Sequence, residues 1–189
     1  MPTQGDFGPT SFHARTQPIW AMYVGATLGV ASSQRQLAFY YHGRGRDHDT
    51  ACAKWATRAA RAGDAEAQYL LAELYLGGFG VEKSPDKAFR WYSASANAGY
   101  IHAQHALAWC FEQGVGTVKN AASAFDWYMK AASQGLGLSM VGVAHCLWKG
   151  LGVERNPDAA LLWARQALER DADGARDLVD EIMKERWPS

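Results

Sequence analysis

The chain has 189 residues, with 19 basic and 19 acidic side chains and therefore a formal net charge of zero. This length fits one domain or at most two. Because nucleic-acid-binding proteins normally carry a basic excess or a basic stripe, the charge balance argues against nucleic acid as a partner. It also gives no support to binding of an anionic membrane. No apolar run reaches the ~20 residues that a membrane-spanning helix needs, so no membrane insertion is expected.

Residues 1–17 mix Pro, Gly, Thr and Gln without a period, which predicts a mobile N-terminal tail. The apolar segment 18–28 that follows has two interpretations. It could be the core of a secretory signal within residues 1–31, and the protein would then be periplasmic or secreted. However, the leading region is long, contains Asp6 and has only Arg15 as a clear positive charge. We therefore favour a helix of a truncated repeat, and a cytoplasmic location.

From residue 63 onward the sequence recurs every 36 residues, since Gly63 is followed by Gly99 and Gly135 at the same place in each unit. A fixed period of this size is the signature of a stacked repeat array. The predicted solenoid spans residues 18–187. Its parts are degenerate N-terminal repeats (18–62), three regular repeats (63–98, 99–134 and 135–170) and a C-terminal capping helix (171–187).

Each unit is predicted to contain two helices. The first helices are expected at 30–42, 65–77, 101–113 and 137–149, and the second helices at 48–62, 85–98, 121–134 and 157–170. A last helix of the first type is expected at 173–187. Ser84, Asn120 and Asn156 are suited to cap the N-termini of second helices, and glycines follow their C-terminal ends. The pattern predicts an all-α, right-handed superhelical solenoid of antiparallel helix pairs, with about four repeats and partial end repeats.

A Gly-x-Gly turn joins the two helices of each unit, as at Gly78-Phe79-Gly80. Such a turn could be taken for a phosphate-binding loop. A dinucleotide fingerprint, however, needs a preceding strand and a third glycine that opens a helix. Here a helix is expected before every copy, so we interpret these glycines as sharp turns that let the second helix fold back on the first.

Equivalent positions in successive repeats, which we call a column, indicate which side chains are buried. Small residues that let helices approach closely recur in two columns: Ala72, Ala108, Ala144 and Ala88, Ala124, Ala160. Bulky residues expected to fill each layer recur in two more: Leu71, Leu107, Val143 and Trp91, Trp127, Trp163. On the last helix, charged side chains stand where a further repeat would need apolar contacts, which predicts a terminal cap. They are Asp177, Asp180, Glu181, Lys184, Glu185 and Arg186.

The repeated motif resembles the Sel-one-like repeat, a relative of the tetratricopeptide repeat. The motif residues are Ala65, Ala67, Gln68, Leu71, Ala72, Leu74, Tyr75, Gly78, Gly80, Val81, Lys87, Ala88, Trp91 and Tyr92. The second copy keeps most of them, whereas the third has Ser139 and Met140 in place of Ala-Gln and Ala164 in place of the second aromatic residue. The resemblance covers about residues 29–183. It implies a scaffold or adaptor that binds other proteins, often in bacteria, and it does not imply catalysis.

Some cysteine-rich relatives staple each repeat with a disulfide, so the three cysteines need an interpretation. Cys110 and Cys146 share a core column with Leu74 and Ile182, and Cys52 lies in the column of Ala88. Equivalent positions in neighbouring repeats should lie roughly 8–10 Å apart, which is too far for a disulfide. We therefore expect three small buried side chains and no disulfide framework.

Binding function is expected where first-helix columns vary, because offsets of three and four residues keep side chains on one face. We call the varying set the first-helix stripe: Tyr69, Glu73, His105, Trp109, Glu112, His145 and Trp148. First helices line the concave surface in helical-pair solenoids. The stripe therefore predicts a groove for a peptide or a helix of a protein partner, with aromatic anchors among polar contacts. Alternatively, Trp109 and Trp148 only pack against the next repeat, and neighbouring Leu76 and Val141 are expected to be partly core.

The histidines of this region also suggest a metal site, formed by His102, His105, His145 and Glu112. Zinc requires three or four converging ligands, and the pattern indicates proximity only. Hydrogen-bonded or solvated histidines are favoured, so no metal or cofactor is expected. No serine or cysteine elbow is present, and the chain is not expected to be an enzyme. Two alternatives stay open: a hydrolase of the β-lactam-binding kind attributed to cysteine-rich relatives, and a structural subunit that binds through its convex face or its ends.

Overall fold

The computed structural model describes residues 18–42 and 44–186. The predicted mobile tail at 1–17 and the last predicted residue of the capping helix, Trp187, lie outside these residues. In the described part of the chain there are ten α-helices and one short 3-10 helix, η1. Their bounds are α1 (Ile19–Thr27), α2 (Ala31–His42), η1 (Arg46–His48), α3 (Asp49–Arg61), α4 (Ala65–Gly77), α5 (Pro85–Asn97), α6 (Ile101–Gln113), α7 (Ala121–Ser133), α8 (Gly137–Lys149), α9 (Pro157–Leu168) and α10 (Ala175–Arg186).

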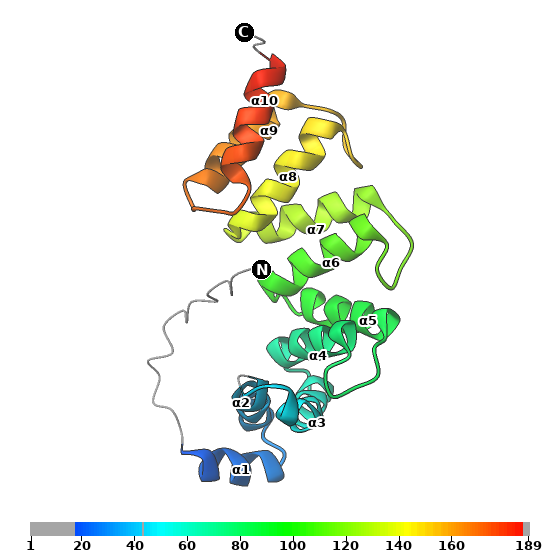
Figure 1. Cartoon of the computed structure of the whole chain (residues 1–189), viewed down its shortest axis with the longest axis vertical. Helices are drawn as coiled ribbons and strands as arrows, with labels where there is room; N and C mark the ends of the chain where they lie inside the picture. Colours follow the sequence, from blue (N-terminus) through cyan, green and yellow to red (C-terminus); the bar gives the residue numbers. More distant parts are fainter. Residues whose placement is uncertain (1–17, 43, 187–189) are drawn as a thin grey trace.

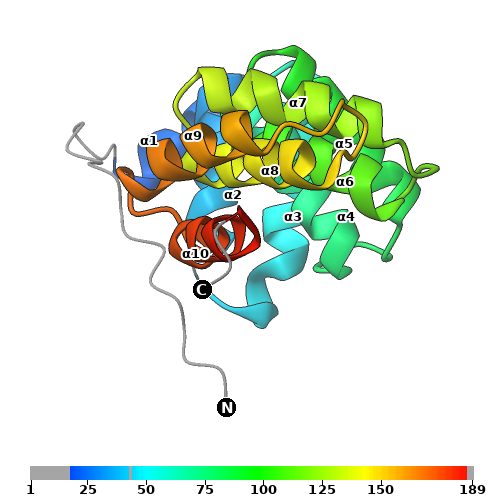
Figure 2. The same ribbon diagram turned by 90° about the horizontal axis from the view of Figure 1, so that it is seen from above.

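The helices pack in sequential pairs and form an elongated helical repeat solenoid (Figure 1). Successive pairs are rotated relative to one another, as the view from above shows (Figure 2). The predicted all-α solenoid is therefore confirmed. The first helices α4, α6 and α8 begin and end at the predicted residues. The second helices α3, α5, α7 and α9 end one or two residues earlier than predicted, just before the glycine or charged turn that follows each of them.

The predicted N-caps of the second helices are present. The side chains of Ser84, Asn120 and Asn156 each accept a hydrogen bond from the backbone N–H three residues further on, at 3.4, 3.0 and 3.0 Å. These bonds occupy N–H groups of the first turn that have no partner inside the helix. The caps therefore fix the residue at which each of these second helices begins.

The second glycine of the Gly-x-Gly turn, which recurs in each regular repeat, has a role that the sequence pattern does not predict. The second glycine, at Gly80, Gly116 and Gly152, has a positive φ of 66–71°. A Cβ on Gly116 would lie 2.2 Å from the carbonyl oxygen of Pro85, the first residue of α5. The turn of one repeat thus rests directly on the N-terminus of the second helix of the preceding repeat, and only glycine leaves room for this contact.

A buried glutamine ties each first helix to the second helix before it. Its Nε2 donates to a backbone carbonyl eight residues earlier, near the C-terminal end of that second helix. The three pairs are Gln34 to Ala26 (3.1 Å), Gln68 to Ala60 (3.2 Å) and Gln104 to Ala96 (3.4 Å). In α8 the equivalent residue is Met140, which cannot make this bond. The third regular copy of the motif therefore lacks this hydrogen bond between helices.

The predicted small and aliphatic core columns are buried, and so are all three cysteines. Each cysteine is free, so the expected absence of disulfides between them holds. The prediction that Trp91, Trp127 and Trp163 fill the core layers holds only in part, because all three pack against the core clusters but stay partly exposed. The adjacent Tyr92, which is 1% exposed, takes that place in its repeat. Trp91 and Trp127 instead each contact two successive core clusters, so they join neighbouring repeats.

The apolar segment at 18–28 forms α1 and packs on the solenoid. Ala26 is buried, and the ring of Tyr23 lies edge-on to Trp55 of α3 with 6.1 Å between centroids. A Cβ on Gly25 would collide with Ser33 of α2, so α1 and α2 approach closely. This arrangement agrees with the truncated-repeat interpretation of this segment. None of the described helices is both long and apolar enough to cross a membrane.

The contact at Gly116 leads to a stability prediction. Gly116→Ala should lower the free energy of unfolding by roughly 3 kcal/mol or more, because it adds a backbone clash to the strain of a positive φ. Gly99→Ala is the matched control: its φ is +90°, but no atom lies within 4 Å of its added Cβ. It should cost only about 1 kcal/mol. Urea unfolding followed by circular dichroism measures both values, and equal losses would contradict this account of the turn.

Candidate functional site

The first-helix stripe is divided by the structure into three groups of contacts, one on each of α4, α6 and α8. Most of its side chains, with Trp109 and His145 as exceptions, contact residues of the paired second helix or of the next first helix. The groups are described in chain order, because the partners of each residue decide whether it is available to an external ligand.

The first group surrounds Tyr69 and Glu73 on α4. The hydroxyl of Tyr92 on α5 donates a hydrogen bond to the carboxylate of Glu73. The ring of Tyr69 lies between those of Tyr92 and Tyr100, at 5.8 and 5.4 Å between centroids. Burial, followed by the negative charge of Glu73, raises the pKa of Tyr69 above its usual range, so the phenol stays protonated. Tyr69 and Glu73 are therefore held in place from inside the chain.

The second group centres on His105 of α6. The hydroxyl of Tyr128 donates to Glu112 Oε2 at 3.0 Å, and the His105 ring lies 5.4 Å from the Tyr128 ring. His105 Nδ1 lies 2.9 Å from the hydroxyl of Ser139, which is buried on α8. Desolvation and the neighbouring His102 lower the pKa of His105, and Glu112 opposes this shift. The imidazole is thus kept neutral and joins one first helix to the next.

The tyrosine–carboxylate bonds show a pattern that sequence reasoning missed. Tyr92 and Tyr128 are equivalent positions, and each has an acidic partner on its first helix, Glu73 or Glu112. The two acids lie in neighbouring columns, one helical turn apart. Ala56 and Ala164 stand where the other two repeats would carry this tyrosine, and the first helices of those repeats have no acid in either column. The repeats that lack the tyrosine therefore also lack the acid. This pairing is visible when the four repeats are aligned.

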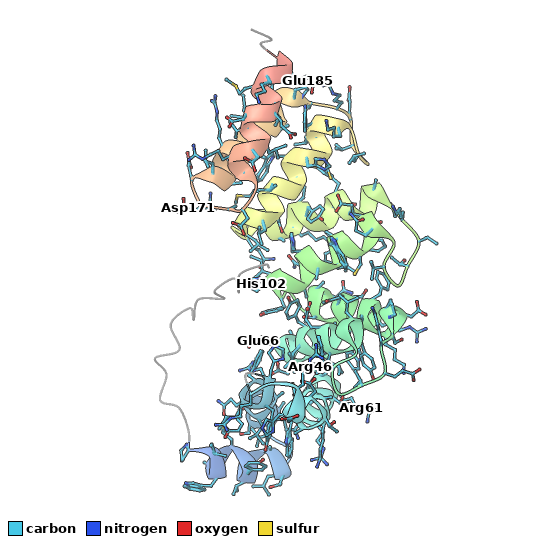
Figure 3. All side chains as sticks on the ribbon, in the orientation of Figure 1. Arg46, Arg61, Glu66, His102, Asp171 and Glu185 are labelled. Carbon is cyan, nitrogen blue, oxygen red and sulfur yellow. The ribbon has the colours of Figure 1, made fainter. Side chains whose placement is uncertain are left out.

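The third group lies at the C-terminal end, around Trp148 of α8. Trp148 is 6% exposed, and its Nε1 donates to Glu185 Oε2 of α10 at 2.6 Å. Figure 3 shows Glu185 in the last turn of α10. Arg155 also binds this carboxylate and donates from Nε to the carbonyl oxygen of Trp148 at 2.9 Å. The indole N–H of Trp148 is therefore already occupied within the chain. His145 lies beside it, with 6.4 Å between ring centroids.

Trp109 differs from the rest of the stripe. Its side chain is 37% exposed, and it occupies the same column as Glu73 and His145. Trp109 thus lies between two groups that are held by internal contacts. Phe39, at the equivalent position of α2, is a second exposed aromatic residue on the first helices, at 42%. Trp109 lines neither of two hollows on the described surface. One of about 250 Å³ is lined by Trp148, Arg155, Pro157, Asp158, Ile182 and Glu185, and a shallow one of about 320 Å³ lies on α5.

Burial also sets the protonation state of the three cysteine thiols. Burial raises the pKa of the Cys52 and Cys110 thiols to about 12 and that of Cys146 to about 11, so none is a thiolate near neutral pH. Within residues 18–42 and 44–186, no three His, Cys, Asp or Glu side chains are grouped so that they could hold a metal ion. His105 faces Ser139, and Glu112 is bound by Tyr128, so these side chains do not converge on one point.

The stacked helix pairs and the glycine turns that join them define a tandem-repeat α/α solenoid. The Sel1 repeat model matches residues 31–64, 65–100, 101–136 and 137–171, which is most of the chain. The chain therefore belongs to the Sel1 repeat family and carries four repeats. Comparison with curated proteins gave no match.

Solved structures with similar folds include a protective antigen of uropathogenic Escherichia coli with an SLR fold. It is 25% identical, has a TM-score of 0.85, and covers 90% of this chain. The present chain spans 37% of the length of that antigen. A Sel1 repeat protein from Oxalobacter formigenes is 24% identical with a TM-score of 0.78, over 89% of this chain and 68% of that one. Helicobacter pylori cysteine rich protein B is more distant, at 19% identity and a TM-score of 0.50 over 62% of this chain and 86% of that one.

The bond between Tyr128 and Glu112 can be tested by a double-mutant cycle. Tyr128→Phe should cost about 1–2 kcal/mol of unfolding free energy, because it leaves a half-buried carboxylate without its donor. In a Glu112→Ala background the same change should cost less, with a coupling of about 1 kcal/mol. Urea unfolding of the four proteins at neutral pH gives the cycle. Strictly additive losses would mean that the two side chains do not stabilise each other.

His105 should make stability depend on pH. Its pKa is lowered in the folded state, so the unfolded chain binds the proton more readily. Stability is therefore complete above the unfolded pKa of about 6.5 and falls as the pH drops below it. His105→Gln should flatten the profile of unfolding free energy between pH 7 and pH 5. His102→Gln, at an exposed position on the same helix, should keep most of the slope, since desolvation is the largest cause of the shift. A wild-type slope in His105→Gln would contradict this assignment.

Proposed function

We propose that this protein is a non-catalytic scaffold or adaptor that binds an extended peptide or a helix of a protein partner on the first-helix face of the solenoid. The observation that carries the proposal is the exposed indole of Trp109 on that face. Exposed tryptophans that become buried on binding are frequent anchors of protein interfaces, and truncation of such a residue costs ~2 kcal/mol or more.

The internal contacts around Trp109 support this proposal. Glu73 is held by Tyr92, Glu112 by Tyr128, and His105 by Ser139. Side chains that are already fixed lose little conformational entropy when a partner binds, so their polar groups can add specificity at low cost. In this proposal Trp109 supplies most of the affinity. The shape and charge around it are set by Tyr69, Glu73, His105, Glu112 and His145. Trp148 is buried and stabilises this face through its hydrogen bond to Glu185 of α10.

The absence of an activated nucleophile among the cysteines favours binding over hydrolysis, because thiols with a pKa of 11 or 12 are poor nucleophiles near neutral pH. A hydrolase of the β-lactam-binding kind would require another group. Incubation of the purified protein with a chromogenic β-lactam tests this part of the proposal. We expect no turnover and no covalent adduct in the intact mass, and a labelled residue would overturn the non-catalytic assignment.

The binding proposal is tested by affinity capture from the native cell with wild type and Trp109→Ala, followed by mass spectrometry. We expect the variant to lose specific partners while its helical content and thermal midpoint stay close to wild type, because the side chain is not part of the buried core. Leu162→Ala is the matched control: it also removes an exposed apolar side chain, but from the second helix α9. If Trp109→Ala keeps every partner that Leu162→Ala keeps, the first-helix face is not the binding surface.

A further inference from the structure

The opposite side of the array, formed by the second helices, carries a composite surface at its N-terminal end. Gly29, Gly63 and Gly99 follow α1, α3 and α5 with positive φ values of 87–90°, so the three helices can be aligned from these glycines. The alignment puts Trp20, Lys54 and Arg90 in one column and Val24, Arg58 and Ala94 in the next. Lys87 lies one turn before Arg90 on the same face. We call Trp20, Val24, Lys54, Arg58, Lys87 and Arg90 the second-helix patch.

The three helices of this patch follow one another in the packed structure. The Tyr23 ring of α1 packs on Trp55 of α3, and Trp91 of α5 packs on the same core cluster that contains Trp55. Columns of equivalent residues on these helices therefore run side by side across the array. Figure 1 shows the same order, with α1 at one end and α3 and α5 following along the long axis.

The α1 part of the patch is apolar and open to solvent. Trp20 is 71% exposed and Val24 is 52% exposed, and α1 contains no charged side chain. Contiguous apolar exposure on a folded domain is a common mark of a binding surface. An exposed tryptophan is also the side chain that contributes most often to the centre of such surfaces.

The α3 and α5 part is basic and unpaired. Lys54, Arg58, Arg61, Lys87 and Arg90 are exposed, and in the described part of the chain none of them lies within 4.0 Å of a carboxylate. Figure 3 shows Arg61 at the outer edge of α3. The cations of Lys54 and Arg58 lie over the Trp55 ring, 5.5 and 5.0 Å from its centroid. This contact orders the two side chains without neutralising them.

A shallow hollow of about 320 Å³ lies within this basic region, lined by Lys87, Arg90, Trp91 and Ala94. Ala94 occupies the column where α3 has Arg58, and its side chain is the smaller of the two. Part of the Trp91 side chain therefore lines the hollow beside Lys87 and Arg90. A carboxylate and the methylene groups that carry it would fit this combination of charge and apolar surface.

The charge of the column changes after two repeats. Asp126 follows Lys54 and Arg90 at the equivalent position of α7, so this column is basic only on α3 and α5, whereas Lys130 of α7 continues the neighbouring column of Arg58 and Ala94. Helices stacked about 10 Å apart put roughly 20 Å between the α1 and α5 columns, a span that an extended segment of about six residues covers. The chain as a whole is neutral, and a basic column that spans only two helices offers few contacts to the phosphates of a nucleic acid. A nucleic-acid partner is therefore not favoured.

We propose that the second-helix patch binds a short acidic segment of a protein partner. Large apolar side chains of the segment would pack on Trp20 and Val24, and its carboxylates would contact Lys54, Arg58, Lys87 and Arg90. This site is separate from the Trp109 face and does not depend on it. A solenoid with two such surfaces can hold two partners at once, or two segments of one partner.

The probe for this site is a fluorescein-labelled octapeptide of two leucines followed by six glutamates, titrated with the whole protein and followed by fluorescence anisotropy. Lys54→Glu with Arg58→Glu should weaken its binding at least tenfold, and Trp20→Ala should weaken it several-fold. The matched control is Lys184→Glu with Arg165→Glu on α10 and α9, away from the patch, which changes the net charge equally and should have a smaller effect. Trp109→Ala should leave the affinity unchanged, so this site and the first-helix face are tested separately.

Lys54→Gln with Arg58→Gln repeats the test without placing new carboxylates on α3, and circular dichroism checks that each variant is folded. The proposal is overturned if both charge-reversed pairs weaken the peptide equally, or if neither weakens it. It is also overturned if a 12-nucleotide oligo-dT or vesicles with anionic lipid bind more tightly than the peptide and lose binding in the Lys54/Arg58 variants. An octapeptide of two leucines followed by six lysines should not bind.

Discussion

The structure depends on the close approach of each Gly-x-Gly turn to the N-terminus of the second helix in the preceding repeat. At Gly80, Gly116 and Gly152 the backbone of the turn leaves no space for a Cβ, and φ is positive. This contact fixes how far one repeat stands from the next. The alanine columns on both helices, the side-chain caps of the second helices and the 36-residue period of the three regular repeats are all consistent with one fixed spacing between repeats.

A fixed spacing determines what the larger side chains do. Trp91 and Trp127 lie between successive core clusters, where they join repeats, while the adjacent tyrosine enters the core of its own repeat. A buried phenol hydroxyl needs a hydrogen-bond partner, and Glu73 and Glu112 supply it from different columns of the first helix. Part of the variation in these columns therefore satisfies a polar group inside the repeat and does not by itself indicate contact with a ligand.

Sequence reasoning predicted the parts of the fold that local chemistry determines. Helix ends follow from Ser84, Asn120 and Asn156 and from the glycines, and the small core columns follow from the period. The sequence did not predict which of two adjacent aromatic residues, such as Trp91 and Tyr92, is buried. Successive side chains on a helix point only about 100° apart, and in a solenoid both of these directions face other helices. The partners of His105 and Trp148 could not be predicted either. Ser139 and Glu185 belong to the following first helices, and their contacts depend on the rotation between repeats.

These contacts change how the two faces of the array should be compared. On the first-helix face, most polar side chains of the stripe already have partners within the chain, so the binding that we propose there relies on exposed Trp109, with the surrounding polar groups contributing shape. On the second-helix face, the cations of α3 and α5 have aromatic neighbours but no carboxylate, so their charge is available. The first face favours a ligand recognised by apolar contact, and the second favours one recognised by charge. Because the same rigid spacing supports both faces, a change in one set of side chains need not disturb the other.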